Sequence, residues 1–198
     1  MTLAVSPFGE GEKWNSFVYK SIVYILSASL SGALFGLFIV ATIQYLISWV
    51  PTSIKLSVIL LLLVSYILKE LKFINLPTPQ MKWQIPTSWV NNSPLKNMVI
   101  WGVILGSGFF TYNPYAIFFI LYLYMGFFMT PIVGLSIGFL YGLSRSLVSF
   151  FIAASCYNDT DKHSEIINKI WSQGRLFGKL NLAALIGLVL YVAYLLLL

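Results

Sequence analysis

The sequence predicts an all-α polytopic membrane protein with about five transmembrane helices. Three observations predict this class: 59% of the 198 residues are hydrophobic and only 9% are charged, and the mean hydropathy is +0.85. A soluble domain carries roughly 25% charged residues, so this chain has too few charges to cover a soluble surface. The same composition excludes a disordered chain, a collagen and a coiled coil. We expect a single transmembrane domain over residues 1–198.

Two apolar runs open the chain, at 16–50 and 54–74. A helix over the first run would be roughly 50 Å long, against ~30 Å of hydrocarbon. It is too short for two spans, so we expect one long, tilted or locally broken helix that ends at Pro51. The connector that follows, 75–97, holds four of the eight prolines, which excludes a continuous helix there.

Three further spans are predicted at 98–125, 131–156 and 180–198. Between the last two lies a hydrophilic connector, 157–179, in which isoleucines and a tryptophan recur at helical spacing among polar residues. This pattern indicates a short amphipathic helix that lies on the cytoplasmic membrane surface.

The positive charges predict the orientation of the five spans. The chain has 12 Lys plus Arg and 6 Asp plus Glu, a net charge of +6. Ten of the twelve cations lie on one side of the predicted spans; the exceptions are Lys55, on the other side, and Arg145, inside the fourth span. The ten are Lys13, Lys20, Lys69, Lys72, Lys82, Lys96, Lys162, Lys169, Arg175 and Lys179. By the positive-inside rule, the N-terminus and both connectors are cytoplasmic and the C-terminus is outside, in a multi-pass plasma-membrane protein whose first partner is the lipid bilayer. Binding of nucleic acid is not expected.

The third span contains a helix-breaking motif, GSGFFTYNPYAIF, centred on Asn113 and Pro114. Proline removes a helical hydrogen bond and pushes the preceding residue out of the helical region, whereas Asn-Pro is a favourable helix start. We therefore expect the span to break near Tyr112 and to restart at Pro114. Two interpretations stay open: a half-helix whose free N–H groups bind an anion or a carbonyl oxygen, or a simple kink repaired by Thr111 or by a neighbouring helix.

Arg145 is a charged residue inside the fourth span, where charges are rare and often functional. From the 100° step of a helix, it lies about 20° from Gly134 and shares one face with Gly138 and Gly142. A glycine stripe is a close-packing face, so Arg145 is expected to point into the protein. The alternative is that its side chain extends to the cytoplasmic interface.

Arg145 and the helix break are predicted to lie at similar depth. Arg145 is roughly 21 Å, and Asn113 roughly 18 Å, from the outer end of its own span. A substrate-binding site made of Thr111, Asn113 and Arg145 is therefore geometrically feasible.

The remaining motifs have structural interpretations. GxxxG spacing predicts helix packing at Gly32 and Gly36 and again at Gly102 and Gly106. Cys156 is the only cysteine and the chain has one histidine, so no disulfide within the chain and no metal or cofactor site is expected. The sequence shows no nucleotide-binding, hydrolase or paired-carboxylate motif, and we expect no enzyme.

Three pieces of residues 97–198 share the layout of a known family: GSGFFTYNPYAIF, the glycine-striped GLSIGFLYGLSRSLVSF, and a basic amphipathic segment leading into KLNLAALIGLVLYVAYLLL. In this layout the second half resembles the membrane domain of CcdA/DsbD-type thiol-electron transporters, within the LysE-like transporter group. The resemblance implies six helices in two inverted halves, each with a redox cysteine beside its helix-breaking proline. Here Tyr115 follows Pro114 and the leading helix of the first half is missing. The scaffold is therefore expected without the thiol relay.

Three functions remain open from the sequence. The first is a transporter-like protein that binds or moves a small anionic or carbonyl-bearing solute. The second is a non-catalytic membrane subunit or assembly factor, with another membrane protein or a second copy of the chain as partner. The third is a thiol-redox protein in which Cys156 acts with a partner.

Overall fold

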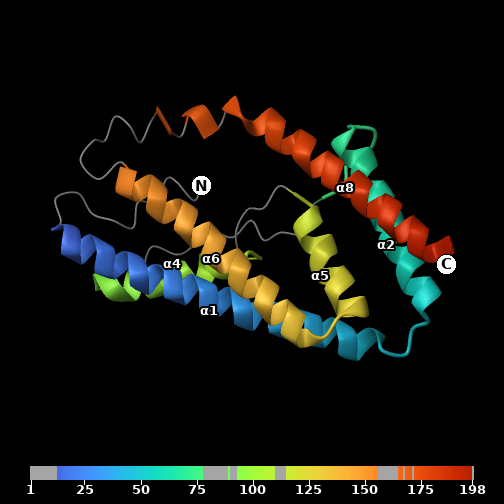
Figure 1. Cartoon of the computed structure of the whole chain (residues 1–198), viewed down its shortest axis with the longest axis horizontal. Coiled ribbons are helices and arrows are strands. Elements are labelled where there is room, and N and C mark those ends of the chain that lie inside the picture. The colour runs from blue at the N-terminus through green and yellow to red at the C-terminus, as the bar shows by residue number, and fades with distance from the viewer. Residues whose placement is uncertain are drawn as a thin grey trace. The chain divides into compact units, whose positions relative to one another are not determined.

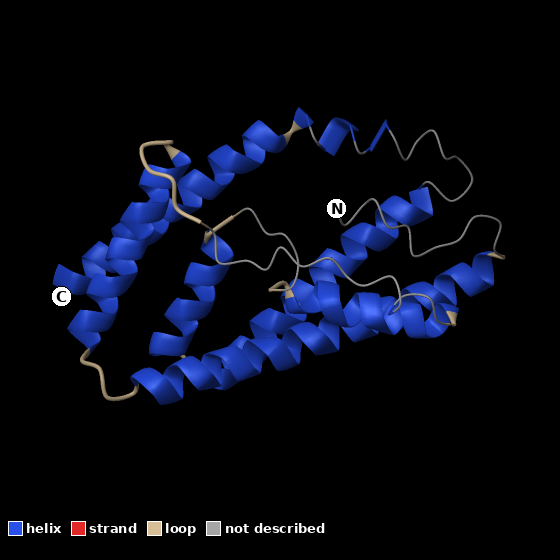
Figure 2. Cartoon of the chain, turned by 180° about the vertical axis from the view of Figure 1, so that it is seen from behind, coloured by secondary structure: helices blue, strands red, loops and turns tan. Residues whose placement is uncertain are grey.

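Figure 1 shows the computed structural model of the chain. The structure describes residues 13–77, 89, 93–109, 115–155, 165–166, 168–170 and 172–197. Every regular element within these ranges is an α-helix, as the colouring of Figure 2 shows. The helices are α1 (Trp14–Ile47), α2 (Thr52–Glu70), α4 (Pro94–Ser107), α5 (Ile117–Phe128), α6 (Pro131–Ser155) and α8 (Gly174–Leu197).

Four of these helices, α1, α2, α6 and α8, are long and apolar enough to cross a membrane. Their outer faces are also apolar: along α1, for example, the side chains of Leu26, Leu30 and Leu34 are more than half exposed. Such stripes suit contact with lipid rather than water. The fold is thus that of a helical integral membrane protein, and the expected total of five spans stays a prediction.

The predicted third span, 98–125, is divided into two short helices, α4 of 14 residues and α5 of 12 residues. The first of them ends earlier than the expected break near Tyr112, because Gly108 caps it with φ +71°. Only glycine adopts this left-handed conformation without a steric penalty. Asn113 and Pro114, at which the restart was predicted, lie outside the described residues.

Helix α2 ends at Glu70, four residues before the predicted limit of its span, because the chain turns there in a Schellman motif. The N–H of Phe73 donates to the carbonyl of Leu68, and the N–H of Lys72 donates to the carbonyl of Lys69, both at 2.9 Å. Lys72 takes the left-handed position with φ +64°, which costs a side-chain-bearing residue about 1 kcal/mol.

Replacing Lys72 by glycine is expected to stabilise the protein by about 0.5–1 kcal/mol, since glycine adopts the same φ without strain. Thermal unfolding of the detergent-solubilised protein measures this change. Asn75→Gly, in the exposed segment just beyond the turn, is the control and should give no gain; an equal gain there would contradict the assignment of strain to Lys72.

The last helix is longer than predicted. Helix α8 begins at Gly174 rather than at 180, so the end of the predicted connector belongs to it. Residues 165–166, 168–170 and 172 are also helical. Ile166 and Ile170 are half-buried while Glu165 and Lys169 are exposed, which is the alternation of an amphipathic helix; its place on the membrane surface stays a prediction.

The chain forms two compact units. The first combines α1 up to Leu37 with α4 and with α6 from Leu135, and the second combines the rest of α1, from Phe38, with α2, α5 and α8.

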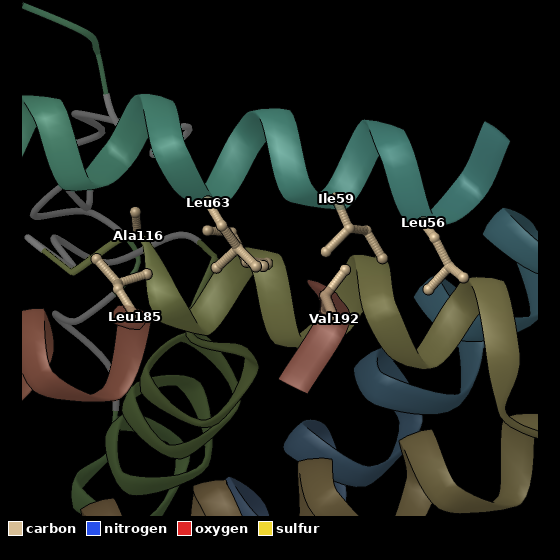
Figure 3. Close-up of a cluster of buried hydrophobic side chains, with 7 residues drawn as sticks. Leu56, Ile59, Leu63, Ala116, Leu185 and Val192 are labelled. Atoms are coloured by element: carbon tan, nitrogen blue, oxygen red, sulfur yellow. The ribbon is translucent and has the colours of Figure 1, made fainter. Parts of the chain in front are cut away.

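The core of the second unit lies where α2, α5 and α8 meet, as Figure 3 shows. Its buried side chains are Leu56, Ile59, Leu63, Ala116, Ile120, Leu185 and Val192. Helices α2 and α8 lie side by side (Figure 1). They run antiparallel, because the last residue of α2, Glu70, contacts Asn181 near the start of α8.

Candidate functional site

The first unit is built on close backbone contacts between α1 and α6. A Cβ added to Gly32 would overlap the carbonyl oxygen of Gly138, and a Cβ on Gly138 would overlap that of Gly32. One turn away, Gly142 meets the carbonyl oxygen of Ala28 in the same manner. The residue numbers fall along α1 as they rise along α6, so the two helices run antiparallel. Backbones can approach this closely only where side chains are absent.

Helix α4 packs on α1 in the same way, but in parallel. A Cβ on Gly102 would lie 2.8 Å from the carbonyl oxygen of Tyr24, and one on Gly106 would overlap the carbonyl oxygen of Ala28. The hydroxyl of Ser31 donates to the carbonyl of Val103 at 2.7 Å. Helices α4 and α6 thus both pack on α1, and Ala28 touches glycines of both.

The other glycines named from the sequence are buried as well. The Cα of Gly36 lies 3.3 Å from a Cβ added to Gly138, and Gly134 is buried near the start of α6.

Arg145 lies on α6 one turn beyond the glycine contacts and is half-buried. Its Nη1 donates to the hydroxyl of Tyr141 at 2.8 Å, and its Cζ lies 5.9 Å from the centroid of the Tyr141 ring. Because helical side chains lean toward the N-terminus of their helix, this contact draws the guanidinium toward the middle of α6 and away from Ser155 at its end. Arg145 therefore does not extend toward the end of α6 that is predicted to be cytoplasmic.

Tyr24 of α1 lies near Arg145, across the contact between α1 and α6. It is 1% exposed, shares a side-chain hydrogen bond with Ser149, and lies close enough to Arg145 to sense its charge. Ser149 in turn donates to the carbonyl of Arg145 at 3.2 Å. We call Tyr24, Tyr141, Arg145 and Ser149 the Arg145 cluster.

A second cation lies on the buried face of α1. Lys20 is only 7% exposed and stands one turn from Tyr24. Next to it, the rings of Phe17 and Phe150 stack with centroids 6.0 Å apart, so this stretch of α1 also faces α6. The sequence pattern assigned Lys20 to the cytoplasmic charges; its burial became evident only from the helix contact.

Two members of the site predicted from the sequence, Thr111 and Asn113, lie outside the described residues, as do Pro114 and Cys156. The described residues therefore place Arg145 beside Tyr24, Tyr141 and Ser149. A contact between Arg145 and the predicted helix break stays a prediction. Tyr24 and Tyr141 were not singled out from the sequence, although Tyr141 stands four residues before Arg145, as Ser149 stands four residues after it. That spacing places them on its face of the helix.

A second polar contact lies in the second unit. Nδ2 of Asn181 donates to Oε1 of Glu70 at 2.8 Å, and Asn181 is 6% exposed. The oxygen Oδ1 of the same amide is buried and has no hydrogen-bond partner among the described residues. The sequence signal for this contact was a lone asparagine in an otherwise apolar run, LNLAALIG.

Chemistry that requires a cluster of metal ligands has no support in the described parts of the chain. No three His, Cys, Asp or Glu residues come together there. The polar chemistry shown by these parts is therefore that of the donor-rich Arg145 cluster and of the Glu70–Asn181 pair.

The resemblance of its second half to CcdA/DsbD-type membrane domains rests on the sequence layout alone. No family model, no curated protein and no solved structure matches the chain.

Proposed function

We propose that the chain is an integral membrane protein of the transporter type that binds, and moves across the membrane, a small anionic or carbonyl-bearing solute at the Arg145 cluster. One observation carries the proposal: a guanidinium, two phenols and a serine hydroxyl meet between two apolar helices. Ionisable groups inside a membrane are costly and commonly mark solute pathways. The cluster is rich in hydrogen-bond donors, which favours an acceptor such as a carboxylate or another oxyanion.

The rigidity of the surrounding helices supports the proposal. Gly138 and Gly142 hold α6 against α1 immediately before Arg145. A donor set held in place by its scaffold loses less entropy when it binds a ligand than a mobile set does. The predicted break near Asn113 and Pro114 and the layout shared with CcdA/DsbD-type domains agree with a transporter, and Thr111 and Asn113 remain proposed substrate contacts.

The test is uptake by proteoliposomes that contain the purified chain. The external probes are the radiolabelled potassium salts of acetate, pyruvate, phosphate and sulfate, and protein-free liposomes are the control. We expect saturable uptake of at least one of these anions, and the same anion should raise the unfolding temperature of the detergent-solubilised protein. Uptake no faster than in protein-free liposomes, together with unchanged unfolding for all four anions, would contradict the proposal.

We also propose that the N-terminus and both long connectors are cytoplasmic, because ten of the twelve cations lie on that side of the predicted spans. Single cysteines placed in a Cys156→Ser background test this orientation. In intact cells, a membrane-impermeant maleimide is expected to label Ser48→Cys and Thr130→Cys but not Asn75→Cys. The three positions are exposed. Labelling of Asn75→Cys before the cells are permeabilised would reverse the orientation.

A second function, that of a subunit in a larger membrane complex, is favoured by two glycines of α8 that no other described element covers. A Cβ added to Gly178 or Gly187 meets nothing within 4 Å, in contrast to the glycines of α1, α4 and α6. Small residues on a membrane helix commonly allow another helix to approach. Native mass spectrometry of gently extracted protein distinguishes the two functions: a second polypeptide at constant ratio supports the subunit, whereas a lone chain or homo-oligomer with a retained anion supports the transporter.

A further inference from the structure

One end of the second unit is strongly basic. The hydrogen bond from Nδ2 of Asn181 to Oε1 of Glu70, at 2.8 Å, places the end of α2 beside the first turns of α8. Two distant segments of the sequence meet there, and each of them supplies two cations. The four residues, which we call the basic end, are Lys69, Lys72, Arg175 and Lys179.

The cations lie close to this contact along their helices. Lys179 stands two positions before Asn181 and Arg175 six positions before it, roughly 3 Å and 9 Å along α8. Lys72 follows Glu70 by two positions, in the turn that ends α2. Like charges gathered in this way create a strong positive potential at one end of the helix pair.

The acidic side chain in this region does not neutralise the basic end. Glu70 is the only Asp or Glu in the sequence of the second unit, and its carboxylate accepts the hydrogen bond from Asn181. None of the four cations forms an ion pair with it among the residues described. Instead, Nζ of Lys69 lies 5.5 Å from the ring centroid of Tyr66, and the other three side chains of the basic end are exposed. The positive charge is therefore accessible to a ligand.

Exposed apolar side chains lie between these charges. Phe73, next to Lys72, is 74% exposed. Phe177, which lies between Arg175 and Lys179, is 41% exposed. Both helices are long and apolar enough to cross a membrane. Cations beside apolar side chains at the end of such helices suit the boundary between lipid headgroups and acyl chains.

The charges at the start of α8 face away from α2. From the 100° step of a helix, Arg175 and Lys179 lie roughly 120° and 160° around α8 from Asn181, which contacts α2. Both side chains are exposed. A ligand therefore reaches them from the outside of the helix pair, where lipid surrounds membrane-spanning helices.

We propose that the basic end binds the phosphate groups of anionic phospholipids such as phosphatidylglycerol. Lysine and arginine donate charge-assisted hydrogen bonds to phosphate oxygens. Each cation close to an anionic membrane surface strengthens the attraction by roughly fivefold. The acyl chains of the same lipid lie against the exposed apolar side chains of α2 and α8, which adds a contact that a free phosphate lacks.

Bound lipid should stabilise the pair of helices that carries the basic end. Its phosphates reduce the repulsion between cations that the contact of Glu70 with Asn181 brings to one place. The binding surface belongs to the second unit, whereas Arg145 belongs to the first. It therefore does not depend on anion transport.

The experiment compares the thermal unfolding of the purified full-length protein in detergent micelles with phosphatidylglycerol or, at the same mole fraction, phosphatidylcholine. Phosphatidylglycerol is expected to raise the unfolding midpoint by about 3–6 °C relative to phosphatidylcholine at low ionic strength. About 0.5 M NaCl should remove most of this difference, because salt screens exposed charges.

Variants with matched loss of charge locate the binding surface. The double variant Lys72→Gln/Lys179→Gln takes one cation from each segment of the basic end and should lose about half of the lipid response or more. The control, Lys13→Gln/Lys55→Gln, removes the same charge from the start of α1 and from the other end of α2, and it should keep the full response. Lys179→Arg retains the charge and should also keep it.

Three results would overturn the proposal. The first is an equal midpoint of the wild type in the two lipids, and the second is a lipid response that survives Lys72→Gln/Lys179→Gln. The third is an equal stabilisation by inorganic phosphate that the same double variant loses, which would assign the surface to a free anion. Arg145→Ala should keep the full lipid response, so failure of the transport site and failure of the lipid site are separate outcomes.

Discussion

Gly138→Ala is expected to destabilise the protein by about 3 kcal/mol, although it adds a single methyl group. That group would overlap the carbonyl oxygen of Gly32 and lie 2.8 Å from its carbonyl carbon. Backbone atoms of a helix cannot turn aside as the end of a side chain can, so α1 and α6 must separate. Overpacking of a tight site costs about 1–3 kcal/mol, and a contact with backbone on both sides belongs at the upper end.

The loss of stability should be larger than the clash alone would cause, because the helices are surrounded by lipid rather than by water. In lipid, apolar helices gain little from the hydrophobic effect when they associate, and close packing supplies most of the attraction. Moving α6 outward would also strain the contact between Gly142 and Ala28. Thermal unfolding in detergent, with protease resistance as a second measurement, reports the change.

Gly187→Ala is the matched control for this prediction. Gly187 is also a glycine within an apolar helix, but a Cβ added there meets nothing within 4 Å. The substitution should leave stability unchanged or raise it by up to about 1 kcal/mol, since alanine is the better helix former. Equal effects at the two positions would contradict the close contact between α1 and α6.

The sequence predicts the helices of this protein because membrane helices are marked by composition along the chain. The apolar runs predict most ends of α1, α2, α6 and α8 to within four residues. The exception is the start of α8, which lies six residues before the predicted position. The ends themselves depend on local backbone conformations that composition does not reveal. Lys72 with φ +64° stops α2 before the apolar run is exhausted, and no sequence rule expects a lysine in that position.

The polar contacts were less predictable because they join residues far apart in the chain. Asn181 and Glu70 are 111 positions apart, and nothing in the sequence around either residue indicates that the other is its partner. Arg145 was recognisable as a charge within a span, and helical geometry placed it on the glycine face. Its partner Tyr24 was not recognisable, since the register between α1 and α6 follows from which glycines meet, and the sequence offers several glycines on each helix.

Arg145→Ala is expected to weaken anion binding by roughly 10- to 100-fold, and to reduce anion uptake by proteoliposomes accordingly. A hydrogen bond to a charged group contributes about 1.5–3 kcal/mol, which corresponds to that range. Arg145→Lys should fall between the wild type and alanine, because lysine keeps the charge but lacks the planar fork of donors. The measurement is the concentration of the transported anion that gives half-maximal uptake.

The control is Arg175→Ala, which removes the other arginine of the chain from an exposed position near the start of α8. It changes net charge by the same amount and should leave uptake nearly unchanged.

Tyr24→Phe removes one donor from the Arg145 cluster while keeping the ring that packs between the helices, so a reduction of anion uptake by a few-fold is expected. Its unfolding midpoint should stay close to that of the wild type, which separates loss of binding from loss of fold. If Arg145→Ala transports the anion as well as the wild type does, the guanidinium is not the anchor. The donors of the cluster would then serve only to hold α1 against α6.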